Sequence, residues 1–123
     1  MGNAMYVLRC AALLLLAGTA MANPLPQRNA QGLLVSNSGR TLYSYDPDGA
    51  TGQSRCSESC AAVWPPYVAD KGARATGDYN VTVRTDGTEQ WVYHGHPLYL
   101  FAGDGKPGDR DGDGVNGSWH VVH

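Results

Sequence analysis

The sequence predicts a small all-β protein, and three observations support this fold class. Residues 81–85 alternate between apolar and polar side chains and are rich in β-branched residues, which favours a strand. Asp86 and Gly87 follow directly, and this dipeptide is the strongest short signal of a β-hairpin. No segment has a long helical period, and the 16 glycines among 123 residues are typical of turns and bends.

One short phrase occurs twice, at residues 39–49 and 95–105. The two copies place Gly, Leu, Tyr, a second aromatic residue, Asp and Gly at equivalent positions. A single tryptophan follows each copy at nearly the same distance, Trp64 in the first and Trp119 in the second. Because one such unit alone leaves a sheet face exposed, we expect two repeats that cover each other.

The expected architecture is a small single domain of two hairpin-based repeats with long loops rich in Gly and Asp. It covers residues 32–123, with the first repeat at about 32–68 and the second at about 81–122. A two-residue turn in the second hairpin places Arg84 opposite Glu89. Strands are expected near residues 32–35, 40–45, 81–85, 88–93, 97–101 and 119–122. A short helical turn through Cys60 is expected to be capped by Ser54 or Ser57.

The repeated phrase also predicts which side chains are buried. Successive strand residues face opposite sides of a sheet. Leu42 and Leu98 are therefore expected at corresponding buried places, on the face opposite Tyr43 and Tyr99.

The first 22 residues have the features of a secretory signal peptide. The apolar run at residues 11–17 is too short to span a bilayer, and Ala20 and Ala22 are the small residues that a signal peptidase recognises. The nearby Cys10 precedes the apolar run, so no lipid attachment is expected. We expect cleavage after Ala22, a flexible leader at residues 23–31 and a mature chain with no transmembrane anchor.

Charge and cysteine content narrow the class of the exported protein. Loss of Arg9 with the signal changes the net charge from −2 to −3, and the absence of a basic patch makes nucleic acid an unexpected partner. Two cysteines remain, Cys56 and Cys60, and an even pair in an exported chain predicts a disulfide.

The repeated phrase resembles the Yx(FWY)xxD motif of a family of small bacterial secreted proteins and lipoproteins, known as secreted repeats of unknown function. Cys56, Cys60 and the segment 64–66 are similar to the family's cysteine and Trp-Pro-Pro segment, and many relatives carry a lipid-attachment site that this chain lacks. The resemblance implies an envelope location and a repeat fold, and it implies no activity. The matching motif residues are Tyr43, Tyr45 and Asp48 in the first copy and Tyr99, Phe101 and Asp104 in the second.

Two groups of residues are candidate metal ligands. Asp109, Asp111 and Asp113 alternate as in the start of a calcium loop, although the twelfth position holds His120 where an EF-hand has Glu. A solvated acidic turn is the simpler interpretation. A copper or zinc site needs His94, His96 or His120 to lie near Cys56 and Cys60, for which the simpler interpretation is a structural disulfide.

Asp48 and Asp104 have two interpretations. Each is expected to close the loop after its strand by accepting backbone N–H bonds. Alternatively, a twofold relation between the repeats makes them a carboxylate pair capable of hydrolysis. The aromatic residues are expected to form most of the core, and a surface that stacks sugars or apolar ligands is the alternative.

These observations favour a non-catalytic periplasmic or secreted cell-envelope protein with a binding or interaction role and an unknown ligand or partner. The alternatives are a copper- or calcium-binding periplasmic protein and a small hydrolase that uses Asp48 and Asp104. An accessory role in the uptake of apolar nutrients such as hydrocarbons rests on the aromatic content alone.

The signal hypothesis predicts that the exported protein begins at Asn23. Intact-mass spectrometry of the exported protein should give the mass of residues 23–123 without any adduct. A mass that retains Met1, or one that includes a lipid, would contradict cleavage after Ala22.

Overall fold

The computed structural model describes residues 23–123, which form short antiparallel strands with very little helix. The predicted signal peptide lies outside these residues. The helical elements are the 3-10 helices η1 (Asp46–Asp48) and η2 (Val115–Gly117) and the α-helix α1 (Ser59–Val63). The strands are β1 (Gln27–Arg28), β2 (Leu34–Val35), β3 (Tyr43–Tyr45), β4 (Tyr79–Val83), β5 (Glu89–Tyr93), β6 (His96–Pro97) and β7 (Trp119–Val121).

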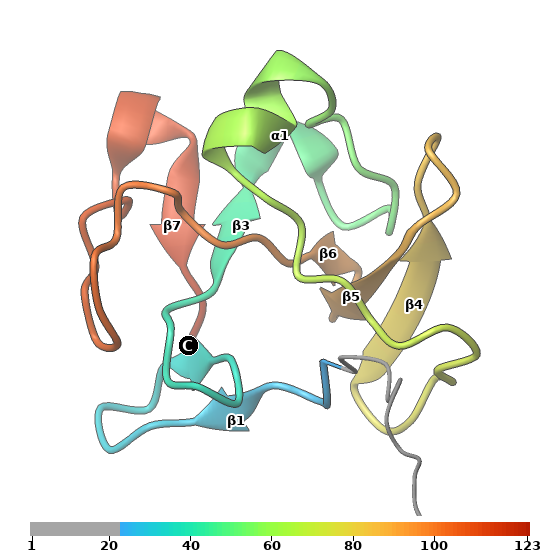
Figure 1. The fold of residues 1–123 in the computed structure, drawn as a ribbon, viewed down its shortest axis with the longest axis horizontal. Coiled ribbons are helices and arrows are strands. Elements are labelled where there is room, and N and C mark those ends of the chain that lie inside the picture. Colours follow the sequence, from blue (N-terminus) through green and yellow to red (C-terminus); the bar gives the residue numbers. More distant parts are fainter. Residues whose placement is uncertain (1–22) are drawn as a thin grey trace, which may run out of the picture.

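The strands form three small sheets. Figure 1 shows β3 beside β7 and β4 beside β5. β1 pairs with β2, and β4, β5 and β6 form a three-stranded sheet. The third sheet pairs β3 of the first repeat with β7, the last strand of the chain, so that Tyr43 lies opposite Val121 and Tyr45 opposite Trp119. The all-β class and the single small domain are therefore confirmed.

Matching hydrogen bonds relate the two repeats by an approximate twofold axis. The Tyr43 and Tyr99 backbones exchange two bonds, with N···O distances of 2.8 and 3.0 Å. Such a reciprocal contact between equivalent residues is the signature of twofold symmetry. On either side, Leu42 N–H donates to the Leu34 carbonyl at 3.1 Å, and Leu98 N–H donates to the Trp91 carbonyl at 3.0 Å. The repeat in the sequence is thus also a repeat in the structure.

The two faces of the repeated strands fill two separate clusters of the core. Leu42 and Leu98 are fully buried in one cluster, and Tyr43 and Tyr99 are fully buried in the other. The alternation of strand side chains produces this division. The predicted burial of both leucines is confirmed.

Four aromatic rings, taken alternately from the two repeats, form a continuous stack within the tyrosine cluster. Trp64 and Trp119 lie at its centre with their ring centroids 3.8 Å apart. Phe101 stacks on Trp64 at 4.4 Å, and Tyr45 stacks on Trp119 at 4.2 Å. Each repeat therefore covers the tryptophan of the other, and neither repeat completes this part of the core alone.

The prediction for the second hairpin turn is wrong. Val83, and not Arg84, lies opposite Glu89. The turn is wider because the Asp86 carboxylate accepts bonds from the backbone and hydroxyl of Thr88, while Arg84 N–H donates to the Thr88 carbonyl.

The predicted helix cap is also wrong. Glu58 is the N-cap residue of α1, and no side chain caps the helix there. The Cys60 N–H donates instead to the Ser57 backbone carbonyl, because the chain enters α1 through a tight turn.

Residues 23–31, for which we predicted a flexible leader, make specific contacts in the structure. Gln27–Arg28 forms β1, which pairs with β2 in an antiparallel sheet. The Asn23 carbonyl accepts the indole N–H of Trp91 at 2.9 Å, and the Pro24 carbonyl accepts the Tyr67 hydroxyl at 2.9 Å. Buried aromatic residues with polar ends need such partners, and the polar composition of the segment did not indicate them.

Truncation of either repeated leucine should cost similar stability. Leu42→Ala and Leu98→Ala should each lower the free energy of unfolding by about 2–5 kcal/mol, because each opens a cavity in the core. Chemical denaturation measures this. Val83→Ala is the control, since Val83 is 66% exposed and should change the free energy little. A cost at one leucine alone would contradict the equivalence of the repeats.

Candidate functional site

Asp48 and Asp104, the acids of the repeated motif, occupy equivalent buried places. They are only 2% and 5% exposed. Asp48 Oδ1 accepts the Arg55 N–H at 2.7 Å, and Asp104 Oδ1 accepts the Asp111 N–H at 3.0 Å. In each case the acid and its donor are seven positions apart along the chain, and the bond closes the loop between them, as the loop-closing interpretation expects.

The second oxygen of each acid binds the tyrosine of the other repeat. The Tyr99 hydroxyl donates to Asp48 Oδ2 at 2.5 Å, and the Tyr43 hydroxyl donates to Asp104 Oδ2 at 2.7 Å. This exchange was not predicted from the sequence. Both copies contain Tyr and Asp five residues apart, which suggests a shared role but does not reveal that the partner lies in the other copy.

The exchange perturbs the proton equilibria of its members. Burial, together with the bond to a carboxylate, holds the pKa of Tyr43 and of Tyr99 well above the ordinary value for tyrosine. Burial also raises the pKa of Asp48, although the Tyr99 hydroxyl, the Arg55 N–H and the charge of Arg84 oppose the shift. These hydrogen bonds and the Arg84 charge therefore stabilise the ionised form of Asp48, which burial alone would disfavour.

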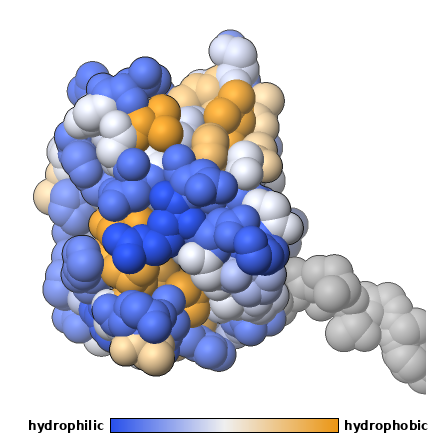
Figure 2. Space-filling view, turned by 90° about the vertical axis from the view of Figure 1, so that its left-hand side faces the viewer, coloured by the Kyte–Doolittle hydropathy of each residue, from blue (hydrophilic) through white to orange (hydrophobic). Residues whose placement is uncertain are grey.

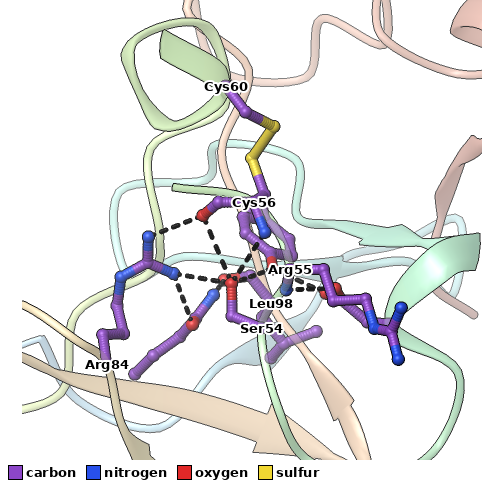
Figure 3. Close-up of a disulfide and its surroundings, with 9 residues drawn as sticks. Ser54, Arg55, Cys56, Cys60, Arg84 and Leu98 are labelled. Atoms are coloured by element: carbon purple, nitrogen blue, oxygen red, sulfur yellow. Dashed lines mark hydrogen bonds between the residues drawn. A yellow bond between two sulfur atoms is a disulfide. The ribbon is translucent and has the colours of Figure 1, made fainter. Parts of the chain in front are cut away.

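The first repeat's acid connects to a wider buried polar network (Figure 3). Ser54 Oγ lies 2.7 Å from the Tyr99 hydroxyl and accepts Arg84 Nη1 at 3.0 Å. The same nitrogen donates to Gln90 Oε1 at 2.9 Å, and Arg84 Nη2 donates to the Cys56 carbonyl at 2.7 Å. This network joins the loop of the first repeat to the hairpin of the second.

The surroundings of the second repeat's acid are simpler. The Tyr43 hydroxyl accepts the Gly112 N–H at 3.2 Å. A side chain at Gly112 would place a Cβ atom 2.7 Å from the Trp64 ring and 3.0 Å from the Tyr43 ring, so glycine is required there. The two halves thus share the tyrosine–aspartate exchange and differ around it.

The predicted disulfide between Cys56 and Cys60 is confirmed. It joins the loop that contains Ser54 to α1 (Figure 3). While the bond is formed, neither cysteine offers a thiolate to a metal ion.

The predicted calcium-loop residues make bonds to the chain itself. Asp109 accepts hydrogen bonds from the Lys106 ammonium and from the backbone N–H groups of Gly105 and Lys106, and these bonds lower its pKa. Asp113 Oδ1 accepts the Val121 N–H at 3.1 Å. Asp111 contributes its backbone N–H to Asp104. The acidic run therefore serves as a loop of the second repeat.

The histidines proposed as soft-metal ligands are dispersed. His94 pairs with Asp78 at 3.1 Å, and His120 pairs with Asp46 at 2.9 Å. His96 lies in β6. Across residues 23–123, no group of three or more His, Cys, Asp or Glu side chains is arranged to hold a metal ion.

The geometry of Asp48 and Asp104 is suited to holding the repeats together. All four carboxylate oxygens accept hydrogen bonds from the protein, and both groups are almost completely buried. A hydrolytic carboxylate pair needs oxygens that reach a substrate or a water molecule. The arrangement therefore does not favour the hydrolase interpretation.

The crossed pairing can be measured by double-mutant cycles. Asp48→Asn and Asp104→Asn should each cost about 1–3 kcal/mol, the range for a lost bond to a charged group. Coupling is expected between Asp48→Asn and Tyr99→Phe, and between Asp104→Asn and Tyr43→Phe. The matched control pairs Asp48→Asn with Tyr43→Phe and should show much weaker coupling. Stronger coupling within each repeat than between repeats would contradict the exchange.

The raised tyrosine pKa values predict loss of stability at alkaline pH. An unfolded tyrosine loses its proton near pH 10, whereas folded Tyr43 and Tyr99 retain theirs. The folded state then binds more protons, so its stability falls as the pH rises above about 10, by up to about 1.4 kcal/mol per pH unit for each tyrosine. Denaturation between pH 8 and about 11.5 measures the slope. Tyr43→Phe with Tyr99→Phe should reduce the slope; a smaller slope should remain because burial also raises the pKa of Tyr67 and of Tyr79. An unchanged slope would contradict the assignment.

The disulfide should contribute modest stability. It closes a very short loop, so Cys56→Ser with Cys60→Ser should cost about 2 kcal/mol by the loop-entropy relation. Thiol titration of the denatured exported protein should find no free thiol. Two free thiols would show that the pair is reduced in its natural compartment.

Comparison with known proteins identifies the family. A family model described as a secreted repeat of unknown function matches the chain twice, at residues 28–68 and 80–123. No curated protein and no solved structure gives a significant match. The two matched segments include both copies of the repeated phrase and cover most of the chain. The chain therefore belongs to the family of secreted repeats of unknown function.

Proposed function

We propose that this protein is a non-catalytic component of the cell envelope, periplasmic or secreted, that acts by binding a ligand or partner. The observation that supports this most is the state of Asp48 and Asp104. The two carboxylates that the hydrolase alternative would use are buried and bonded to the protein at every oxygen. Their role is to join the repeats, which leaves function to the surface that the repeats present.

The proposed location combines two observations. The family is described as secreted, and the first 22 residues have the features of a cleaved signal peptide. Within residues 23–123, no helix is long and apolar enough to cross a membrane.

The aromatic residues do not favour a role in the uptake of apolar nutrients. Trp64 and Trp119 are buried within the ring stack, so core packing accounts for much of the aromatic content. On the face shown in Figure 2, polar and charged residues separate the hydrophobic areas. Surfaces that bind large apolar partners are typically continuous apolar patches.

Two assays of the purified mature protein test the proposal. Co-sedimentation with envelope fragments of the producing cells, separated into cell wall and membrane, should retain the protein in one fraction at saturable levels. Chromogenic ester, glycoside and phosphate substrates should show no turnover above that of the Asp48→Asn and Asp104→Asn variants. Turnover that both variants abolish while they remain folded would overturn the non-catalytic assignment. The absence of saturable binding to any fraction would overturn the envelope role.

A further inference from the structure

The disulfide lies at a place where the two repeats differ. Cys56 directly follows Arg55, the N–H donor to the first motif acid, and Gly112 directly follows Asp111, the N–H donor to the second. Cys56 and Gly112 are therefore equivalent, and both are buried. The second repeat closes its loop without any cysteine, so the repeat fold alone does not require the bond to Cys60.

The bonded cysteines enclose a turn in which the backbone of Glu58 is strained. The cysteines are four positions apart, and the turn between them is closed by the Cys60 N–H, which donates to the Ser57 carbonyl at 3.1 Å. Glu58 is at the first central position with φ 54° and ψ −118°, the geometry of a type II′ turn. This position favours glycine, because a Cβ atom is hindered there. The Glu58 side chain makes no capping bond to α1 that would offset the cost.

A disulfide in this setting is easily reduced. The loop it closes is very short, so the bond stabilises the fold little. Because the two effects belong to one thermodynamic cycle, the fold in turn stabilises the bond little. The strained backbone of Glu58 opposes the closed loop further. Disulfides held in strained loops are the ones that exchange readily with thiols.

The two cysteines differ in their exposure to an attacking thiol. Cys56 is fully buried, at 0% exposure. Cys60 is only half-buried, and it lies in α1, a helix that has no buried residue. The three residues between the cysteines are exposed as well. Exchange requires that a thiolate reaches one of the sulfur atoms, which favours attack at Cys60.

Both ends of the disulfide loop lead directly to contacts that join the repeats. At one end, Cys56 N–H donates to Ser54 Oγ at 3.2 Å, and this oxygen lies 2.7 Å from the Tyr99 hydroxyl (Figure 3). At the other end, the Cys60 carbonyl accepts the Trp64 N–H at 2.8 Å, and Trp64 lies at the centre of the ring stack. The disulfide therefore holds together the segments that carry Ser54 and Trp64.

We propose that the Cys56–Cys60 disulfide is a site of reversible exchange with an external dithiol of the thioredoxin type, and that its reduction loosens the contacts of the first repeat with the second. A deprotonated thiol of the partner attacks Cys60 Sγ, the S–S bond breaks, and Cys56 leaves as a thiolate that takes up a proton. The partner's second thiol loses its proton and attacks the mixed disulfide, which releases Cys60 to take up a proton in turn. Two electrons pass to the protein, and the dithiol becomes a disulfide. This inference goes beyond the binding role proposed above and does not depend on it.

Equilibration of the folded mature protein with glutathione redox buffers tests the exchange. Alkylation of free thiols followed by mass spectrometry measures the reduced fraction. Cys56 and Cys60 should become reduced in buffers that leave structural disulfides of secreted proteins oxidised. Resistance of the bond until the protein is denatured would overturn the proposal.

Variants of the turn isolate the contribution of the strain. Glu58→Gly relieves it and should lower the equilibrium constant for reduction by glutathione about fivefold or more, the effect expected of one strained residue. Ser59→Gly is the matched control, because it adds a glycine to the same loop at a residue whose φ is not positive, and it should not lower the constant. Glu58→Ala removes the carboxylate but keeps the strain, and it should behave as the wild type. Equal constants for the two glycine variants would contradict the role of Glu58.

Backbone NMR spectra of the oxidised and the reduced ¹⁵N-labelled mature protein test the effect on the repeats. Reduction by dithiothreitol should shift the Ser54 and Arg55 amide signals and the indole signal of Trp64. The amide signals of β1 and β2, which contribute little to this contact, should remain in place. Shifts confined to residues 56–60 would show that reduction does not reach the contacts between the repeats and would overturn this part of the proposal.

Discussion

The exchange of tyrosine–aspartate bonds between the repeats is the interaction on which the rest of this structure depends. Asp48 and Asp104 close the loops of their own repeats, yet each needs the tyrosine of the other repeat to satisfy its second oxygen. An acid buried without that donor would incur a desolvation cost of about 1–3 kcal/mol or more. One repeat alone would leave its acid and its tyrosine without partners. The motif therefore specifies a pair of repeats, and this explains why the phrase occurs twice in so short a chain.

The apolar contacts of the core also depend on partners from the other repeat. Trp64 and Trp119 stack on each other across the repeat boundary, and each is covered on its other face by a ring from the opposite repeat. The tyrosines of the exchange and the rings of the stack lie in one cluster, so the bonds that join the repeats are shielded by aromatic rings. Shielding strengthens the hydrogen bonds, and the hydrogen bonds orient the rings.

The two repeats also differ from each other in three features. The second hairpin is longer, and the disulfide occurs in the first repeat only. In addition, the second repeat has the buried Gln90 at the position where the first has the buried Leu33. All three meet at Arg84, which bonds to Gln90 and to the Cys56 carbonyl. The second tyrosine–aspartate pair forms without any of these features. There the Gly112 backbone N–H donates to the Tyr43 hydroxyl. Function is best sought where the two halves differ, because what they share is used in holding them together.

The sequence by itself determined the all-β class, the two repeats, the disulfide and the burial of Leu42 and Leu98, because strand alternation, repetition and cysteine pairing are visible over short distances along the chain. It also indicated that Asp48 and Asp104 close their loops. Only the tertiary structure decided that Tyr99 donates to Asp48, that residues 23–31 supply acceptors for Trp91 and Tyr67, and that Arg84 joins the two repeats. These partners lie between 28 and 68 residues apart, and nothing in local pattern or propensity links them. Such contacts form because a buried polar atom needs a partner, and which partner it meets is set by the packing of the repeats.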